Sequence, residues 1–373
     1  MSEYEILRLI WWALLGVLLT GFAVMDGFDL GTAALLPFVG RTDKERRVAI
    51  NAIGPVWEGN QVWFVVGGGS IFAAWPMLYA ASFSGFYLAM FLVLATLILR
   101  PVGFKFRGQI DNARWRGFWD WCLFAGGIVP ALVFGVAFGN LFQGVPFSFD
   151  ETLRMQSQIT LPGLLNPFAL LVGLVSLSMI ALHGAAWLNH KTRGRVQDRA
   201  RAAMPWLAAA FVIAFALAGL WLSQKSGYRI AGVMAHDGPS NPLLKHVARG
   251  SWLQNYSEMP LLWLAPLLAF AGAGLAILLR ARPLAAFFCT GLAIAATIAT
   301  AGAALFPFLL PSSTMPDASL TVWDASSSRL TLAVMLGVTA LILPVVALYT
   351  GWAYRVLRGP VSEESLETDG HSY

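Results

Sequence analysis

Long apolar runs alternate with short polar segments along nearly the whole chain of 373 residues. Each run has about 20 residues, which is enough for a helix to cross about 30 Å of hydrocarbon. The runs occupy residues 10–31, 57–75, 78–99, 118–142, 161–188, 204–222, 260–279, 284–310 and 329–354. The pattern therefore predicts an all-α integral membrane protein with about nine transmembrane helices.

The order of the runs favours two four-helix bundles followed by one additional helix, although it does not establish an internal repeat. We expect the first bundle at residues 1–150 and the second at 151–328, with the ninth helix and a polar tail at 329–373. The second bundle would contain the longest polar segment, 223–259. That segment is either a folded contact surface or an ordinary solvated loop.

Composition supports a membrane protein, and the distribution of cations predicts its orientation. The chain is 57% hydrophobic and 12% charged, against about 25% charged residues in soluble domains. Of 25 Lys and Arg residues, 18 follow the first, third, fifth, seventh and ninth runs, in segments beginning near Arg41, Arg100, Lys191, Arg280 and Arg355. Because cytoplasmic loops are enriched in cations, we expect a periplasmic N-terminus and a cytoplasmic C-terminus. The basic balance thus reflects topology, and nucleic acid is not an expected partner.

Three acidic residues, Asp26, Asp29 and Glu58, lie within the first two runs. A carboxylate near the bilayer centre costs at least about 2.5 kcal/mol, so such groups normally face protein or water. The spacing of Asp26 and Asp29 places both on one helix face. Beside them, Ala23, Gly27 and Gly31 form a row of small residues that permits close approach of another helix.

These acids suggest a ladder of carboxyl groups that leads inward from the cytoplasm. If the second helix starts near residue 50, Glu58 lies roughly 10–12 Å inside it. Arg100, at the end of the third run, could pair with one of the acids. The group is either a proton relay or a structural ion pair, and we favour the relay.

Residues that bind metals or carry soluble-enzyme chemistry are sparse. Cys122 and Cys289 fall within predicted helices, and no CxxC, zinc spacing, phosphate-binding loop or convincing GxGxxG is present. Of five histidines, only His183 lies clearly inside a run. One histidine cannot provide a bis-histidine haem site, and hydrogen bonding at a helix interface is the favoured role of His183. We expect no metal site, no haem iron ligand and no directly catalytic residue in this chain.

Several long motifs resemble one known family. They are GFAVMDGFDLG, ERRVAINAIGPVWEGNQVW, GGGSIFAAWPMLYAASFSGFYLA, LRPVGFKFR, FGNLFQGVPF, LLNPF and LFPFLLPSSTMPDASLTVWDASSSRLTL. Together they closely resemble subunit II of the bacterial cytochrome bd ubiquinol oxidases, and the similarity runs nearly end to end. Many relatives have Asp at the position of Glu58, and a hydrated path should tolerate the extra methylene.

The resemblance implies a heterodimer in the bacterial cytoplasmic (inner) membrane that oxidises quinol, reduces dioxygen to water and generates a proton-motive force. Subunit I would carry two b-type haems, one d-type haem and the quinol-oxidising loop. Subunit II would support assembly and conduct cytoplasmic protons, with Glu58, Asp29, Asp26 and Arg100 in the proton pathway. The resemblance also allows a structural quinone at contacts that we cannot assign, surrounding membrane lipids and small accessory subunits.

Two other functions fit the residues considered without the resemblance. A secondary transporter also has intramembrane acids and helices broken by Pro or Gly. A purely structural assembly partner would use the same acids as ion pairs. Copurification with a haem-bearing protein would distinguish an oxidase subunit from a transporter.

Overall fold

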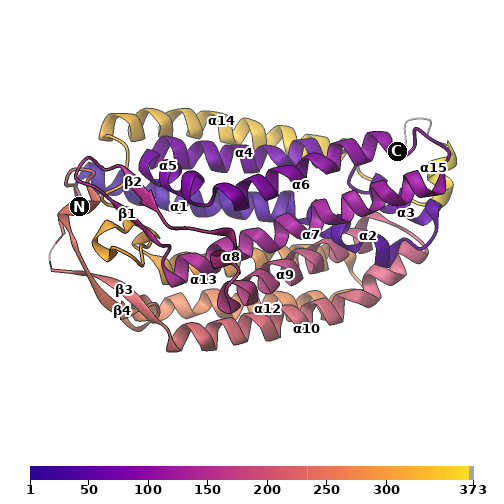
Figure 1. The fold of residues 1–373 in the computed structure, drawn as a ribbon. Helices are drawn as coiled ribbons and strands as arrows, with labels where there is room; N and C mark the ends of the chain where they lie inside the picture. Colours follow the sequence, from indigo (N-terminus) through magenta and orange to yellow (C-terminus); the bar gives the residue numbers. More distant parts are fainter. Residues whose placement is uncertain (233, 369–373) are drawn as a thin grey trace.

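The computed structural model describes residues 1–232 and 234–368, so the end of the predicted tail, 369–373, lies outside the described residues. The chain forms an elongated bundle whose long helices lie roughly along one axis (Figure 1). In the described part, eight helical segments are long and apolar enough to cross a membrane. The helix α4 has only 18 residues and a polar first turn, and it accounts for the remaining predicted span.

The helices of the first half are α1 (Glu3–Met25), α2 (Gly27–Val39), α3 (Asp43–Asn51), α4 (Trp57–Ala74), α5 (Pro76–Gly85), α6 (Tyr87–Phe106) and α7 (Ala113–Gln143). Those of the second half are α8 (Leu161–Leu164), α9 (Pro167–Lys191), α10 (Arg195–Gln224), α11 (Gln254–Glu258), α12 (Leu264–Leu278), α13 (Pro283–Leu305), α14 (Arg329–Val356) and α15 (Glu363–Thr368). Short 3₁₀ helices are η1 (Pro242–Leu244), η2 (Pro260–Trp263) and η3 (Pro316–Ala318). The predicted all-α membrane fold with about nine spans is confirmed.

Three predicted runs differ from the helices in detail. The first run is two consecutive helices, α1 and α2, that meet at Asp26 and continue to Val39. The third run is split at Phe86 into α5 and α6. The run predicted at 284–310 leaves the helix after Leu305, because the residue before Pro307 is sterically restricted from helical conformations.

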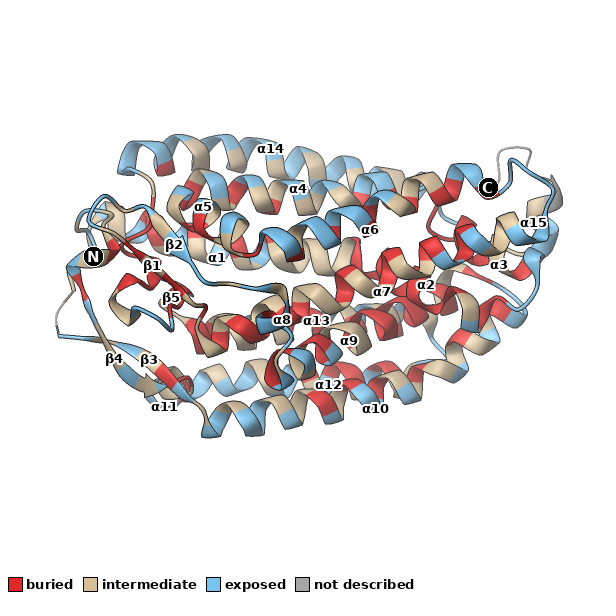
Figure 2. Cartoon of the chain, in the orientation of Figure 1, coloured by how far each residue is buried: buried red, intermediate tan, exposed pale blue. Residues whose placement is uncertain are grey.

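The described residues form three antiparallel strand pairs at the end of the bundle that holds the N-terminus (Figures 1 and 2). They are β1 (Phe147–Phe149) with β2 (Met155–Ser157), β3 (Ser226–Ala231) with β4 (His246–Ser251), and β5 (Phe308–Leu310) with β6 (Leu320–Thr321). The β3–β4 pair runs in register from Ser226 opposite Ser251 to Ala231 opposite His246. The described residues of the predicted polar segment 223–259 therefore form the β3–β4 hairpin together with the short helices η1 and α11.

The helix α9 packs among α2, α7, α10 and α13 and is mostly buried in its second half (Figure 2). Its crossing with α2 depends on glycine. A Cβ atom added at Gly31 would lie 2.1 Å from the Ile180 carbonyl oxygen, and one added at Gly184 would lie 2.3 Å from the Gly31 carbonyl carbon. Gly31, the last of the three predicted small residues, thus does allow a close helix crossing.

The helix α14 lies at the edge of the bundle and is the most exposed of the long helices. All of its residues are described, and only Leu332 is buried. Most of this helix is coloured as exposed or intermediate in Figure 2. Its exposed side chains include the large apolar residues Leu341, Ile342 and Leu348. Exposed apolar residues of this kind suit contact with lipid or with another membrane subunit.

Candidate functional site: buried carboxyl groups around Arg100

A buried ion pair lies where α1 meets α2. Arg100, on α6, donates from Nη1 to Asp26 Oδ2 at 3.2 Å and from Nη2 to Asp26 Oδ1 at 3.0 Å. Both side chains are at most 1% exposed. Two parallel bonds of this kind hold a guanidinium and a carboxylate in a fixed geometry. The predicted proximity of Arg100 to one of the acids is confirmed, and the partner is Asp26.

Asp29 extends this pair into a longer polar chain. Its Oδ2 atom is 4.0 Å from Arg100 Nη2 and accepts a hydrogen bond of 2.8 Å from Asn60 Nδ2 on α4. The hydroxyl of Tyr354, on α14, donates to Asn60 Oδ1 at 2.7 Å. A continuous polar connection thus runs from the peripheral helix α14 through α4 and α2 to the ion pair. We call these five residues the Arg100 cluster.

The Arg100 cluster is incompletely satisfied. Among the described residues, Asp29 Oδ1, Arg100 Nε and the neighbouring Thr32 Oγ1 have no hydrogen-bond partner. Two carboxyl groups share one guanidinium, so full ionisation would leave a net negative charge in a buried site. Buried charges are unfavourable unless they are paired and hydrogen-bonded. The arrangement can therefore hold a proton on one carboxyl group or hydrogen-bond a water molecule.

Glu58 does not join this cluster. The helices α3 and α4 are separated by a turn, and α4 begins at Trp57. Glu58 therefore lies in the first turn of α4, and the expected helix start near residue 50 is wrong. Its side chain is exposed and forms no hydrogen bond or ion pair within the described part of the chain. Two residues later, Asn60 points inward and makes the contact with Asp29.

His183, on α9, contacts the last turn of α1 beside the junction at Asp26. Its Nε2 atom donates to the Val24 carbonyl oxygen at 3.0 Å, and its Nδ1 atom is 2.7 Å from Thr290 Oγ1. In an uninterrupted helix the Val24 carbonyl would accept from the amide four residues later. A side chain that inserts into this ladder is a known cause of helix irregularity. His183 is thus buried and hydrogen-bonded at a helix interface, which was its favoured role.

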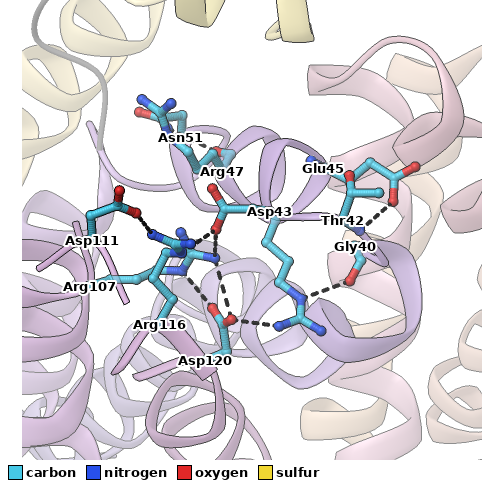
Figure 3. Close-up of polar contacts among 11 residues, drawn as sticks. Gly40, Thr42, Asp43, Glu45, Arg47, Asn51, Arg107, Asp111, Arg116 and Asp120 are labelled. Carbon is cyan, nitrogen blue, oxygen red and sulfur yellow. Dashed lines mark hydrogen bonds and ion pairs between the residues drawn. The ribbon is translucent and has the colours of Figure 1, made fainter. Parts of the chain in front are cut away.

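A second cluster of charged side chains lies at the end of the bundle where α3 is found. Asp120 accepts from Arg107 Nε at 2.6 Å and from Arg46 Nη1 at 2.7 Å. Arg107 also reaches Asp43 at 2.8 Å, and Arg116 lies between Asp43 and Asp111 (Figure 3). These contacts join α3, α6 and α7 into one end of the bundle.

Beside this group, Glu45 caps the start of α3. Its Oε2 atom accepts from the backbone amides of Arg41 and Thr42 at 2.7 and 3.0 Å and from Arg199 Nη1 at 2.7 Å. Thr42 completes a capping box with Glu45. Hydrogen bonding to Arg199, the largest influence, together with the two amides, lowers the pKa of Glu45 to about 2.

Another buried ion pair lies at the opposite end, among the strand pairs. Lys245 Nζ is 2.7 Å from Asp324 Oδ2 and also donates to the Pro242 and Asp317 carbonyl oxygens at 3.0 and 3.1 Å. Burial lowers the pKa of Lys245, while the Asp324 carboxylate raises it. The pair ties the segment after β6 to the turn before β4, so its role is structural.

Sequence reasoning missed Asn60 and Tyr354, because it considered acidic, basic, histidine and cysteine side chains within the apolar runs but not amide or phenol groups. The pair Asn60 and Gln61 was a usable signal, since amide side chains in a membrane helix form hydrogen bonds across helices. Tyr354 offered no comparable signal, because tyrosine near the end of a span is also expected in the interfacial belt.

Residues 7–357 match the model of the family described as cytochrome bd terminal oxidase subunit II. The chain belongs to this family. It is 51% identical to the cytochrome bd-I ubiquinol oxidase subunit 2 of Escherichia coli K12 over the full length of both chains. It is 32% identical to the cytochrome bd ubiquinol oxidase subunit 2 of Bacillus subtilis, over 95% of this chain and 97% of that protein.

The fold is also similar to a chain of the bd oxidase structure from Geobacillus thermodenitrificans, with a TM-score of 0.67 over 94% of this chain and 98% of that chain. At 16% identity this similarity concerns the fold alone. As a subunit II of a cytochrome bd ubiquinol oxidase, the chain is part of a terminal respiratory oxidase complex. Family membership implies a subunit I partner and a multi-pass position in the inner membrane.

Proposed function

We propose that this subunit II binds no haem, supports assembly of the complex and conducts cytoplasmic protons through Glu58, Asp29 and Asp26. The observation that carries this proposal is the Arg100 cluster, in which two buried carboxyl groups share one guanidinium and Asp29 Oδ1 has no partner among the described residues. A site of this kind exchanges a proton at a smaller cost than a fully paired carboxylate would.

The exposure of Glu58 supports a partner subunit at this face. Glu58 shares the outward face of α4 with Val62, Val65, Gly69 and Phe72, at helical spacing. A carboxyl group on such a face would contact lipid unless another protein covers it, at a cost of about 2.5 kcal/mol or more. We therefore place subunit I, with its two b-type haems and one d-type haem, against α4. Covered in this way, Glu58 would deliver protons between the subunits and toward Asp29.

The proton pathway is tested with Glu58→Gln, which keeps the shape and removes the exchangeable proton. We expect slower quinol-dependent oxygen consumption in a complex that retains its haems and both subunits. Glu58→Asp should retain much of the activity, because it restores the residue that many relatives carry. Glu151→Gln is a matched control, since Glu151 is an exposed acid at the other end of the bundle. Normal turnover and proton uptake by Glu58→Gln would favour the purely structural interpretation.

The absence of haem ligands is supported by the hydrogen bonds at both ring nitrogens of His183. His183→Gln keeps a donor for the Val24 carbonyl oxygen and removes the imidazole. We expect all haem absorption bands to persist in the assembled complex. Selective loss of one band would show that His183 binds haem iron.

The orientation is supported by the cations at the α3 end, which we propose is cytoplasmic. Gly108, between α6 and α7, and Glu151, between β1 and β2, are exposed at opposite ends. With Cys122 and Cys289 replaced by serine, an impermeant maleimide should label Glu151→Cys in intact spheroplasts and label Gly108→Cys only after lysis. The reverse result would invert the topology.

A further inference from the structure

A cavity of about 990 Å³ opens at the α3 end, and Tyr354 is the one member of the Arg100 cluster that lines it. Its walls come from the end of α9, the start of α13, the last turns of α14 and the segment that follows α14. Phe28, Trp187 and Tyr354 form an aromatic wall, with the Phe28 and Trp187 rings stacked at 4.2 Å. The cavity therefore combines an apolar interior with a position at the boundary of the membrane-spanning helices.

Three cations line this cavity: Lys191, Arg193 and Arg358. Backbone bonds fix their relative positions, because the Val361 amide donates to the Lys191 carbonyl oxygen at 2.7 Å and the Arg193 amide donates to the Val361 carbonyl oxygen at 3.0 Å. Lys191 Nζ also donates to the Leu357 carbonyl oxygen. The segment after α14 is thus pinned to the end of α9, which brings Arg358 close to the other two cations.

These three charges have no acidic partner in the part of the chain with described side chains. The side chain of Arg193 donates only to the carbonyl oxygens of His190 and Thr192. Glu363 and Glu364, on α15, are exposed and form no ion pair with the three cations. Like charges held together repel one another, so an anion bound among them would lower the energy of the site.

The apolar part of the cavity wall indicates which kind of anion would bind there. Leu284 and Phe288 on α13 and Ala347 on α14 line the cavity and are exposed in the chain. On helices that span a membrane, such side chains contact acyl chains. Basic pockets between membrane helices at the cytoplasmic side are suited to anionic lipid head groups.

We propose that this cavity binds an anionic phospholipid. Its phosphate lies among Lys191, Arg193 and Arg358, and an acyl chain extends along the apolar wall between α13 and α14. The site is separate from the proposed proton pathway, although Tyr354 borders both. The bound lipid would contact the protein where the segment after α14 packs against the end of α9.

The charge requirement is tested in the purified two-subunit complex after delipidation. The variant Lys191→Gln/Arg193→Gln/Arg358→Gln is compared with Arg195→Gln/Arg280→Gln/Arg282→Gln, which removes three exposed cations from the same end but outside the cavity. Binding of phosphatidylglycerol and phosphatidylcholine is measured by native mass spectrometry. At about fivefold per cation, the cavity variant should bind phosphatidylglycerol roughly 100-fold more weakly, while the control variant and phosphatidylcholine binding should change little.

The shape requirement is tested with glycines of α14. Gly351 lines the cavity and an added Cβ there meets no atom within 4 Å, so Gly351→Leu would fill the space without disturbing packing. Gly337→Leu is the control, since Gly337 is equally open but outside the cavity. Only Gly351→Leu should reduce phosphatidylglycerol binding.

Three results would overturn the proposal. The first is equal phosphatidylglycerol binding in the cavity and control variants. The second is displacement of the bound lipid by millimolar inorganic phosphate, which would indicate a site for a soluble anion. The third is a quinone that copurifies with the wild-type complex but not with the Gly351→Leu complex, while the two complexes bind phosphatidylglycerol equally well.

Discussion

Arg100 on α6 and Asp26 at the junction of α1 and α2 form a doubly hydrogen-bonded ion pair, with nitrogen to oxygen distances of 3.0 and 3.2 Å. The pair is buried, so its net contribution to stability is small compared with the cost of breaking it. Asp29 Oδ2 lies 4.0 Å from Arg100 Nη2, so two carboxyl groups surround one guanidinium. This excess distinguishes the site from a simple structural ion pair.

Removing Arg100 should destabilise the subunit strongly. Arg100→Gln leaves two buried carboxyl groups without a counter-charge, and we expect a loss of about 3–5 kcal/mol. The thermal unfolding midpoint of the purified complex measures the loss, with Arg114→Gln as an exposed control on the same side. The double variant Asp26→Asn/Arg100→Gln should recover part of the midpoint, because it removes both members of the pair. An unchanged midpoint in Arg100→Gln would contradict this account.

The crossing of α2 and α9 should tolerate no side chain at Gly31. In Gly31→Ala the new Cβ would lie 2.1 Å from the Ile180 carbonyl oxygen, so the helices must separate. We expect a destabilisation of about 1–3 kcal/mol or more, measured as a lower unfolding midpoint. Gly16→Ala, on α1, is the matched control, because its Cβ meets no atom within 4 Å. Similar midpoints for the two variants would refute the close crossing.

Asn60 should be needed for rapid turnover. Asn60→Leu removes the donor to Asp29 Oδ2 and interrupts the polar connection to Tyr354. A hydrogen bond to a charged group contributes about 1.5–3 kcal/mol, so oxygen consumption should fall about tenfold or more with haem content unchanged. Tyr354→Phe removes only the outer bond and should have a smaller effect. If Asn60→Leu consumed oxygen at the normal rate, the hydrogen-bonded connection would not serve proton transfer.

Glu45 should contribute stability that depends on pH. Because its pKa is lowered from 4.5 to about 2 in the folded state, its contribution is fully present above pH 4.5 and is lost as the pH falls toward 2. Glu45→Gln keeps the capping geometry and removes the charge. The wild-type complex should therefore unfold at a higher temperature than Glu45→Gln at pH 7, and the difference should narrow below pH 4.5. A constant difference from pH 7 to 3 would exclude this linkage, and Glu151→Gln serves as the exposed control.

The sequence by itself determined the membrane fold and the approximate positions of its spans, because the length of an apolar run is a local property. It also indicated the small residues of the α2 crossing and the burial of Asp26 and Asp29, since charged groups in apolar helices must face protein or water. Family membership followed from motifs that are contiguous in the sequence.

Only the tertiary structure decided how the polar groups are shared between helices. Glu58 and Asn60 are two residues apart and so point to nearly opposite faces of α4. The apolar residues of α4 form no clear stripe, so its periodicity could not show which face is buried. The packing of α4 against α1 turns Asn60 toward Asp29 and leaves Glu58 outside. In the same way, Asp26 pairs with a residue 74 positions away in the sequence, and only the packing of α6 against the first helices brings the two together.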